Sequence, residues 1–223
     1  MEITLDQQLF PHILGKIICV GRNYPAHAKE LNNPIPTSPI LFIKPASSAV
    51  PFAPNFSIPQ QQGRVHHELE IAILISKALC HADTEEVTKS IAGIGLGLDL
   101  TLRDIQDQLK EKGHPWERAK SFDGACPLTG FVSVSAVSFL DWYALELMLI
   151  KNGEMRQQGS SANMLFPILP LIAHISKHFS LQPGDVILTG TPAGVGPLSA
   201  GDSLSCELSL GHSVLLTQDT MVL

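Results

Sequence analysis

The stretch Val65-His66-His67-Glu68-Leu69-Glu70-Ile71-Ala72-Ile73-Leu74-Ile75 decides the fold of this chain, because it has the alternation of a β-strand. Successive side chains of a strand point to opposite faces. The positions of Leu69, Ile71 and Ile73 therefore predict one face that packs in a hydrophobic core. Glu68 and Glu70 share the opposite parity, so we expect their carboxylates to project together.

A third acid, Asp99, lies in a second apolar stretch, Ile94-Gly95-Leu96-Gly97-Leu98-Asp99-Leu100. Carboxylates in apolar strands are costly to desolvate unless something pairs with them. A hard divalent cation such as Mg²⁺ is a natural partner for several carboxylate oxygens. The acids alone leave two interpretations open: a metal site, or a solvated strand face with an aspartate at a strand end.

The composition of the 223-residue chain predicts a folded, cytoplasmic protein with a sizeable core. It is 44% hydrophobic and 16% charged, which argues against disorder. The net charge is −6 and no long basic run occurs, so we expect neither a nucleic-acid nor a membrane partner. The N-terminus lacks the pattern of a signal peptide, and no apolar run reaches transmembrane length. The four widely spaced cysteines predict reduced thiols rather than disulfides or a zinc site.

Seventeen glycines and 16 prolines punctuate the chain, which predicts many short strands and few helices. Further strands are expected at 16–20, 40–44, 145–151, 186–189 and 204–208, with a hairpin turn at Asn152-Gly153. Helices are expected at 25–31, 84–92, 103–112 and 167–179, the second capped by Asp83 and stopped by Gly93. No β-α-β alternation appears, so a doubly wound parallel sheet is unexpected.

Several familiar catalytic motifs are absent from the sequence. The glycine-rich segments at 93–97 and 190–196 lack the spacing of a dinucleotide fingerprint and the Gly-Lys-Ser/Thr of a P-loop. There is no His-Glu-x-x-His and no Gly-x-Ser-x-Gly. Zinc proteolysis, serine hydrolysis and NTP hydrolysis therefore have no support.

Six segments taken in order resemble the fumarylacetoacetate hydrolase family, from about residue 16 to the C-terminus. They are Val20-Gly21-Arg22-Asn23-Tyr24 with His27 and Glu30, Phe42-Ile43-Lys44-Pro45, His66-His67-Glu68-Leu69-Glu70, Asp99-Leu100-Thr101-Leu102-Arg103-Asp104-Ile105-Gln106, Ala119-Lys120-Ser121-Phe122, and Ile187-Leu188-Thr189-Gly190-Thr191-Pro192 with Gly194-Val195-Gly196. The compact length is most similar to the acylpyruvase and oxaloacetate decarboxylase branch.

The resemblance implies a β-rich α+β fold of rolled, layered mixed sheets with a few short helices. It implies a single catalytic domain over 16–223, preceded by an N-terminal segment over 1–15, and usually a homodimer. It also implies Mg²⁺ or Mn²⁺ held by residues matching Glu68, Glu70 and Asp99.

Three residues are candidates for catalysis. His27 and Glu30 are three apart and share a face of a short helix, where Glu30 would orient His27 as a general base. Spacing alone favours a solvated surface pair, but this helix resembles the lid that closes over the site in the family. Lys120 is expected in a loop, where a lone lysine is usually a surface charge. The resemblance implies instead that Lys120 reaches the metal site.

Five further residues are candidates for substrate binding. Arg103 and Gln106 share a helix face, although Arg103 has an alternative role in an ion pair with Asp99 or Asp104. Arg22 and Lys44 either anchor substrate or bracket the acids. Thr191 lies in a loop that offers a hydroxyl and backbone N–H groups for a carboxylate, or simply forms a tight turn.

The expected substrate is a small 2-oxo acid. The leading hypothesis is a Mg²⁺-dependent hydrolase that cleaves the C–C bond of acylpyruvates such as acetylpyruvate or fumarylpyruvate, with decarboxylation of oxaloacetate as an additional activity. The alternative is an isomerase, tautomerase or decarboxylase of 2-hydroxydienoates or oxaloacetate. A non-enzymatic binding protein is the third possibility.

Overall fold

A mixed sheet of eight strands forms the centre of the protein. The computed structural model describes residues 1–137 and 140–223. Along the sheet the strands run β4 (Ile40–Lys44), β3 (Ile17–Gly21), β15 (Val186–Leu188), β8 (Leu69–Ile75), β9 (Ile91–Leu98), β11 (Cys126–Leu128) and β5 (Ala49–Pro51), with β12 (Val132–Ser133) paired to β9. Strands β3 and β15 are parallel, while β8 is antiparallel to both of its neighbours.

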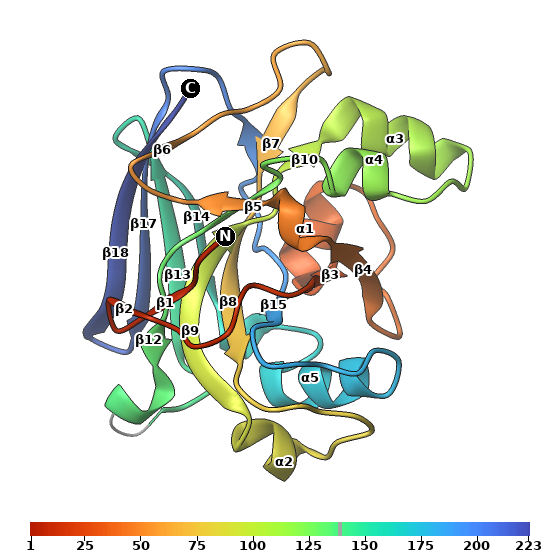
Figure 1. Cartoon of the computed structure of the whole chain (residues 1–223). Coiled ribbons are helices and arrows are strands. Elements are labelled where there is room, and N and C mark those ends of the chain that lie inside the picture. The colour runs from red at the N-terminus through yellow and green to blue at the C-terminus, as the bar shows by residue number, and fades with distance from the viewer. Residues whose placement is uncertain (138–139) are drawn as a thin grey trace.

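A second sheet of five strands packs against the central one and is drawn at the left of Figure 1. Its order is β14 (Glu154–Ser160), β13 (Leu145–Lys151), β17 (Ser203–Leu210), β18 (Ser213–Val222) and β6 (Asn55–Phe56). Leu69, Ile71 and Ile73 of β8 share one hydrophobic core with Leu147 of β13 and Leu208 of β17. The face predicted from strand parity is therefore confirmed as a core face.

The other face of β8 is also buried, which the alternating pattern did not predict. Ala72 and Leu74 pack in a second core with Cys19 of β3 and with Ile3 and Phe10 of the N-terminal segment. That segment contributes the small hairpin of β1 (Thr4–Leu5) and β2 (Gln8–Leu9). Because both faces are covered, the interpretation of Glu68 and Glu70 as a solvated face is wrong.

A three-stranded sheet lies beside the site, in the order β10 (Thr101–Leu102), β7 (Val65–His67) and β16 (Gly196–Pro197). The stretch 65–75, expected as one strand, is thus divided at Glu68 into β7 and β8. The division lets one continuous segment pair with two different sheets. Glu68 itself stands at the junction.

The described part of the chain contains five short α-helices. They gather at two places, as Figure 1 shows. In the described residues, α1 (Pro25–Glu30), α3 (Arg103–Glu111) and α4 (Glu117–Lys120) lie around one end of the central sheet, and α2 (Thr84–Thr88) packs on α5 (Ile168–Ser176) at the other. Single 3₁₀ turns occur at Ala46–Ser48, Val134–Ala136 and Ser161–Asn163. The short helix α4 holds Lys120, which was expected in a loop.

Helix α2 begins where predicted but ends earlier. Asp83 accepts a hydrogen bond from the Glu86 N–H at 2.9 Å, and the Glu86 carboxylate accepts one from the Asp83 N–H at 3.0 Å, which is a complete capping box. The prediction that the helix continues to Ala92 and stops at Gly93 is wrong. Ile91 is already in β9, paired with Ile75, so sheet pairing overrides local helix propensity.

The hairpin turn predicted at Asn152-Gly153 is confirmed. Asn152 and Gly153 have φ of 52° and 80° and join β13 to β14, as a two-residue hairpin with positive φ requires. All four cysteines are free thiols. Within residues 1–137 and 140–223, no helix has the length and apolar character needed to cross a membrane. The homodimer and the cytoplasmic location stay predictions.

Candidate metal and substrate site

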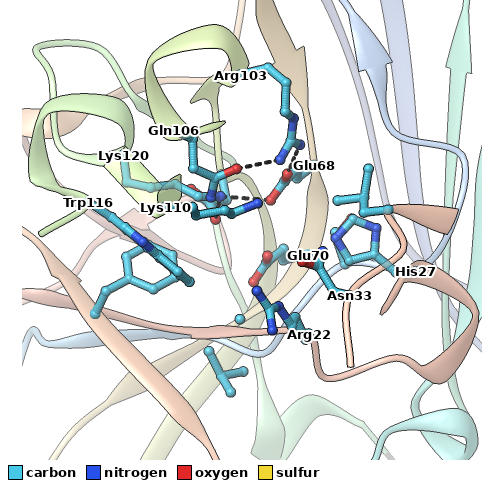
Figure 2. Close-up of a pocket in the computed structure, with 16 residues that line it drawn as sticks. Arg22, His27, Asn33, Glu68, Glu70, Arg103, Gln106, Lys110, Trp116 and Lys120 are labelled. Atoms are coloured by element: carbon cyan, nitrogen blue, oxygen red, sulfur yellow. Dashed lines mark hydrogen bonds and ion pairs between the residues drawn. The ribbon is translucent and has the colours of Figure 1, made fainter. Parts of the chain in front are cut away.

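Three buried carboxylates meet where β8 begins and β9 ends. Leu69 pairs with Leu98, and the Asp99 N–H donates to the Glu68 carbonyl at 2.8 Å, so Asp99 lies beside the glutamates. Glu68, Glu70 and Asp99 are 5%, 1% and 2% exposed, and one carboxylate oxygen from each lies within 4.8 Å of the others. Figure 2 shows Glu68 and Glu70 in the middle of the pocket.

Three cations bracket two of these acids. The Lys120 ammonium donates to Glu68 at 2.8 Å and to Asp99 at 2.6 Å, and Arg103 forms an ion pair with Glu68. Lys44 Nζ lies 2.8 Å from Asp99 Oδ1. That contact has a poor hydrogen-bond direction, so Oδ1 keeps a free lone pair despite its burial.

The surroundings shift the pKa values of Glu68 and Glu70 in opposite directions. Burial by itself would raise the pKa of Glu68, but the charges of Lys120 and Arg103 hold that pKa well below its usual range. Burial and the charges of Asp99 and Glu68 raise the pKa of Glu70 well above its usual range. Glu70 therefore lacks the compensating cation that its neighbours have.

The donor set fits a hard divalent cation. Only carboxylate oxygens converge, which suits Mg²⁺ or Mn²⁺ rather than zinc or copper. Each of the three acids contributes one oxygen to the group, and Glu70 enters it without a cation of its own. Within the described part of the chain, no other group of three acidic, histidine or cysteine side chains has this geometry.

The His27 ring lines the same pocket from α1, opposite the acids (Figure 2). Its Nδ1 lies 3.3 Å from Glu30 Oε2, which is the contact expected for a base and the carboxylate that orients it. Glu30 does not itself line the pocket. Its other oxygen accepts from the Gly194 N–H at 3.0 Å and so ties α1 to the loop that contains Thr191.

The structure places four of the five predicted substrate-binding residues on the pocket wall: Arg22, Arg103, Gln106 and Thr191. Arg103 donates to Gln106 Oε1 at 2.6 Å. Its ion-pair partner is Glu68, so the predicted alternative pairing with Asp99 or Asp104 is wrong. Lys44 lies behind Asp99 and does not line the pocket, a position that suits bracketing of the acids rather than substrate contact.

Sequence reasoning missed Lys110 and Trp116, which also line the pocket. Lys110 is seven residues after Arg103 and four after Gln106, so helical spacing was an available signal. It also missed Gln157 of β14, which no motif marks and which reaches the site only through the packing of two sheets.

Gln157 is a buried amide that joins the metal-site strands to the loop of Thr191. Its Oε1 accepts from the Leu69 N–H at 2.9 Å and lies 3.0 Å from His67 Nδ1. Its Nε2 donates to Thr191 Oγ1 at 2.7 Å and to the Pro192 carbonyl at 3.0 Å. His67 and Leu69 flank Glu68, so Gln157 holds the side chain of one neighbour of Glu68 and the backbone of the other.

Replacing Gln157 with Leu should lower the free energy of unfolding by about 1–3 kcal/mol or more, because the Leu69 N–H loses its partner in a buried place. Urea unfolding of Gln157→Leu measures this loss. Gln158→Leu is the matched control, since Gln158 is exposed on the same strand. Equal stability of the two variants would contradict the bridging role.

The comparisons with known proteins agree with this fold. The family described as "Fumarylacetoacetate (FAA) hydrolase C-terminal" matches residues 16–215. The chain belongs to the fumarylacetoacetate hydrolase family. The resemblance and the fold class inferred from the sequence are thereby confirmed.

Two curated family members illustrate the similarity in sequence. The oxaloacetate tautomerase of Escherichia coli (strain K12) is 48% identical over 206 residues, which cover 92% of this chain and 93% of that protein. The mitochondrial oxaloacetate tautomerase of Homo sapiens is 41% identical over 193 residues, which cover 86% of each.

Two solved structures of the family illustrate the similarity in fold. A protein from Oleispira antarctica, described as a putative fumarylacetoacetate isomerase/hydrolase, has a TM-score of 0.97, 75% identity and full coverage of both chains. Fumarylpyruvate hydrolase from Pseudomonas aeruginosa, in complex with Mn²⁺ and pyruvate, has a TM-score of 0.88 and 31% identity, covering 100% of this chain and 95% of that one. The family therefore processes oxo acids, and this relative binds a divalent metal.

Proposed function

We propose that this protein is a divalent-metal-dependent enzyme that interconverts the keto and enol forms of 2-oxo acids, with oxaloacetate as the main substrate. The observation that carries the proposal is one pocket that combines a three-carboxylate cluster, two bracketing cations and the base candidate His27. The similarity to proteins named oxaloacetate tautomerases supports the choice of substrate. The choice reverses the ranking suggested by sequence alone, where acylpyruvate hydrolysis came first.

Glu68, Glu70 and Asp99 are the residues that would hold Mg²⁺ or Mn²⁺. When bound, such an ion supplies a Lewis acid for the oxygens of a 2-oxo acid. The buried carboxylates would fix its place, and the charges of Lys120 and Arg103 keep Glu68 ionised by lowering its pKa.

His27 is the proposed base for the proton at C3 of the substrate. With Nδ1–H donating to Glu30, the neutral ring has its lone pair on Nε2. The C3 proton moves to Nε2, the C3–H electron pair forms the C2–C3 double bond, and the pair of the C2–O π bond moves to the carbonyl oxygen. The imidazolium then gives its Nε2 proton to that oxygen, which returns His27 to its neutral form. The positive charges of Arg103 and Lys120 favour the negative charge that develops on that oxygen.

Hydrolysis of acylpyruvates is the second candidate. It needs a base to activate water, and the 3.3 Å contact between His27 and Glu30 favours such a base. The similarity to fumarylpyruvate hydrolase supports it as well. Decarboxylation of oxaloacetate needs no attacking water. It would use the same positive charges to favour the negative charge that develops on the carbonyl oxygen.

Parallel assays separate these reactions. Purified protein is treated with EDTA, resupplied with Mg²⁺ or Mn²⁺, and given oxaloacetate or acetylpyruvate. Loss of the enol absorbance of oxaloacetate reports tautomerisation, and release of pyruvate reports decarboxylation or hydrolysis. The proposal predicts metal-dependent tautomerisation faster than either release of pyruvate. Tautomerisation no faster than in protein-free buffer would refute it, and rapid cleavage of acetylpyruvate would favour the second candidate.

A further inference from the structure

Two cations on the pocket wall, Arg22 and Lys110, have no buried anion as a partner. Arg103 and Lys120 are paired with the buried acids, but Arg22 and Lys110 are not. In the described residues, the one carboxylate within 4 Å of Lys110 is that of the exposed Asp107, at 3.7 Å, and Arg22 has none. Burial lowers the pKa of Arg22, and no neighbouring charge offsets this loss.

The backbone brings the Arg22 side chain to the pocket at some cost. Arg22 follows β3 with φ of 60°, the left-handed region that non-glycine residues seldom adopt. Lys110 lies in the last turn of α3, on the face shared by Arg103 and Gln106. Figure 2 shows Lys110 and Arg22 reaching from opposite sides toward the space in front of Glu70.

The two cations are also near enough to repel one another. The charge of Arg22, along with burial and the charge of Arg103, lowers the pKa of Lys110. Two like charges directed into one half-buried space destabilise the empty pocket unless an anion occupies it. Strain, desolvation and repulsion together point to a ligand that supplies the missing negative charge.

The charges of the metal site narrow the chemical class of that ligand. Glu68, Glu70 and Asp99 are offset by Arg103, Lys120 and the buried Lys44. A divalent cation would add two positive charges to this balanced group. A 2-oxo acid brings one carboxylate to that centre, and Arg22 and Lys110 then remain available for another.

We propose that Lys110 and Arg22 form a subsite for a second carboxylate, at the far end of the substrate from the 2-oxo group. This inference rests on the proposed function and deepens it, because it assigns the substrate to the 2-oxo dicarboxylic acids. Oxaloacetate has such a group at C4. Acetylpyruvate is nearly the same shape but has a methyl ketone there, so the subsite distinguishes the two by charge.

The test compares Lys110→Met with Lys112→Met. Both variants remove one lysine charge from the C-terminal end of the same helix, but Lys112 is exposed and does not line the pocket. Methionine keeps the apolar stem. Arg22→Gln serves as a second variant of the subsite.

For Lys110→Met, kcat/KM for oxaloacetate should fall roughly 10- to 100-fold, mainly through KM, because one charge-assisted hydrogen bond is lost. The inhibition constant of acetylpyruvate should change less than about 3-fold, since no such bond is made with it. Lys112→Met should match the unaltered protein for both compounds. An equal loss for both compounds, or no loss for oxaloacetate, would overturn the subsite.

A binding measurement separates this inference from the proposed function. Calorimetric titration of oxaloacetate and of acetylpyruvate, with Mg²⁺ present, needs no turnover. Selective weakening of oxaloacetate binding in Lys110→Met supports the subsite even if the protein proves to catalyse another reaction. If titration shows equal affinities in both variants, the subsite is wrong even where tautomerisation is confirmed.

Discussion

Replacing Glu70 with Gln should abolish metal binding while leaving the protein folded. Glu70 has a raised pKa and lacks a bracketing cation, so its charge is costly in the absence of metal. The amide oxygen of Gln can still accept the hydrogen bond that the Gly190 N–H donates at 2.6 Å. We expect metal affinity to fall by more than the roughly 10- to 100-fold that changes around ligands usually cause. Tautomerisation should fall with it.

The same change at Glu68 should have a different outcome. Glu68 is the partner of both Arg103 and Lys120, so Glu68→Gln leaves buried positive charge without its counter-ion. Breaking such a pair costs about 3–5 kcal/mol of stability. Mn²⁺ titration and urea unfolding of both variants, with exposed Glu111→Gln as the control, measure the contrast. Unchanged metal affinity in Glu70→Gln would refute the ligand assignment.

Replacing His27 with Gln should slow tautomerisation about 10²- to 10⁴-fold, the usual contribution of a general base. Glutamine retains polarity and can still reach toward Glu30, but it cannot accept a proton from carbon. Metal affinity should not change, because His27 is not among the carboxylate ligands.

The exposed His12 provides the control for this variant, as His12→Gln alters a histidine that does not line the pocket. Steady-state rates and Mn²⁺ titration of both variants show whether the substitution affects proton transfer or metal binding. A His27→Gln enzyme with a normal rate would show that another group removes the proton. A parallel loss of metal affinity would show instead that the substitution disturbs the metal site.

Strand parity predicted part of the site correctly and left the rest open. It placed Leu69 and Ile71 in a core and Glu68 and Glu70 on one side. Parity could not show that Ala72 is buried too, because the covering N-terminal segment is distant in sequence. Whether the acids faced water or a cation depended on that covering and on the pairing that brings Asp99 beside Glu68.

The incorrect and missing predictions share one physical cause, which is contact between segments that are distant in sequence. Local signals extended the helix at Thr84 too far, since only the pairing of Ile91 with Ile75 shows that the chain has entered the sheet. Lys44 was considered for substrate contact because it ends a strand, but its ammonium turns inward to Asp99. Gln157 gains its importance from four hydrogen bonds across two sheets, none of which has a trace in sequence spacing.

Deuterium incorporation at C3 of oxaloacetate in D₂O tests the central claim most directly, because it follows the proton that the enzyme is proposed to move. EDTA-treated protein is assayed by NMR before and after Mn²⁺ is restored, beside a protein-free solution with the same Mn²⁺. The account predicts exchange above that solution's rate with Mn²⁺, and none above it with EDTA or with Glu70→Gln. Exchange equal to the protein-free rate, or undiminished by EDTA, would contradict it.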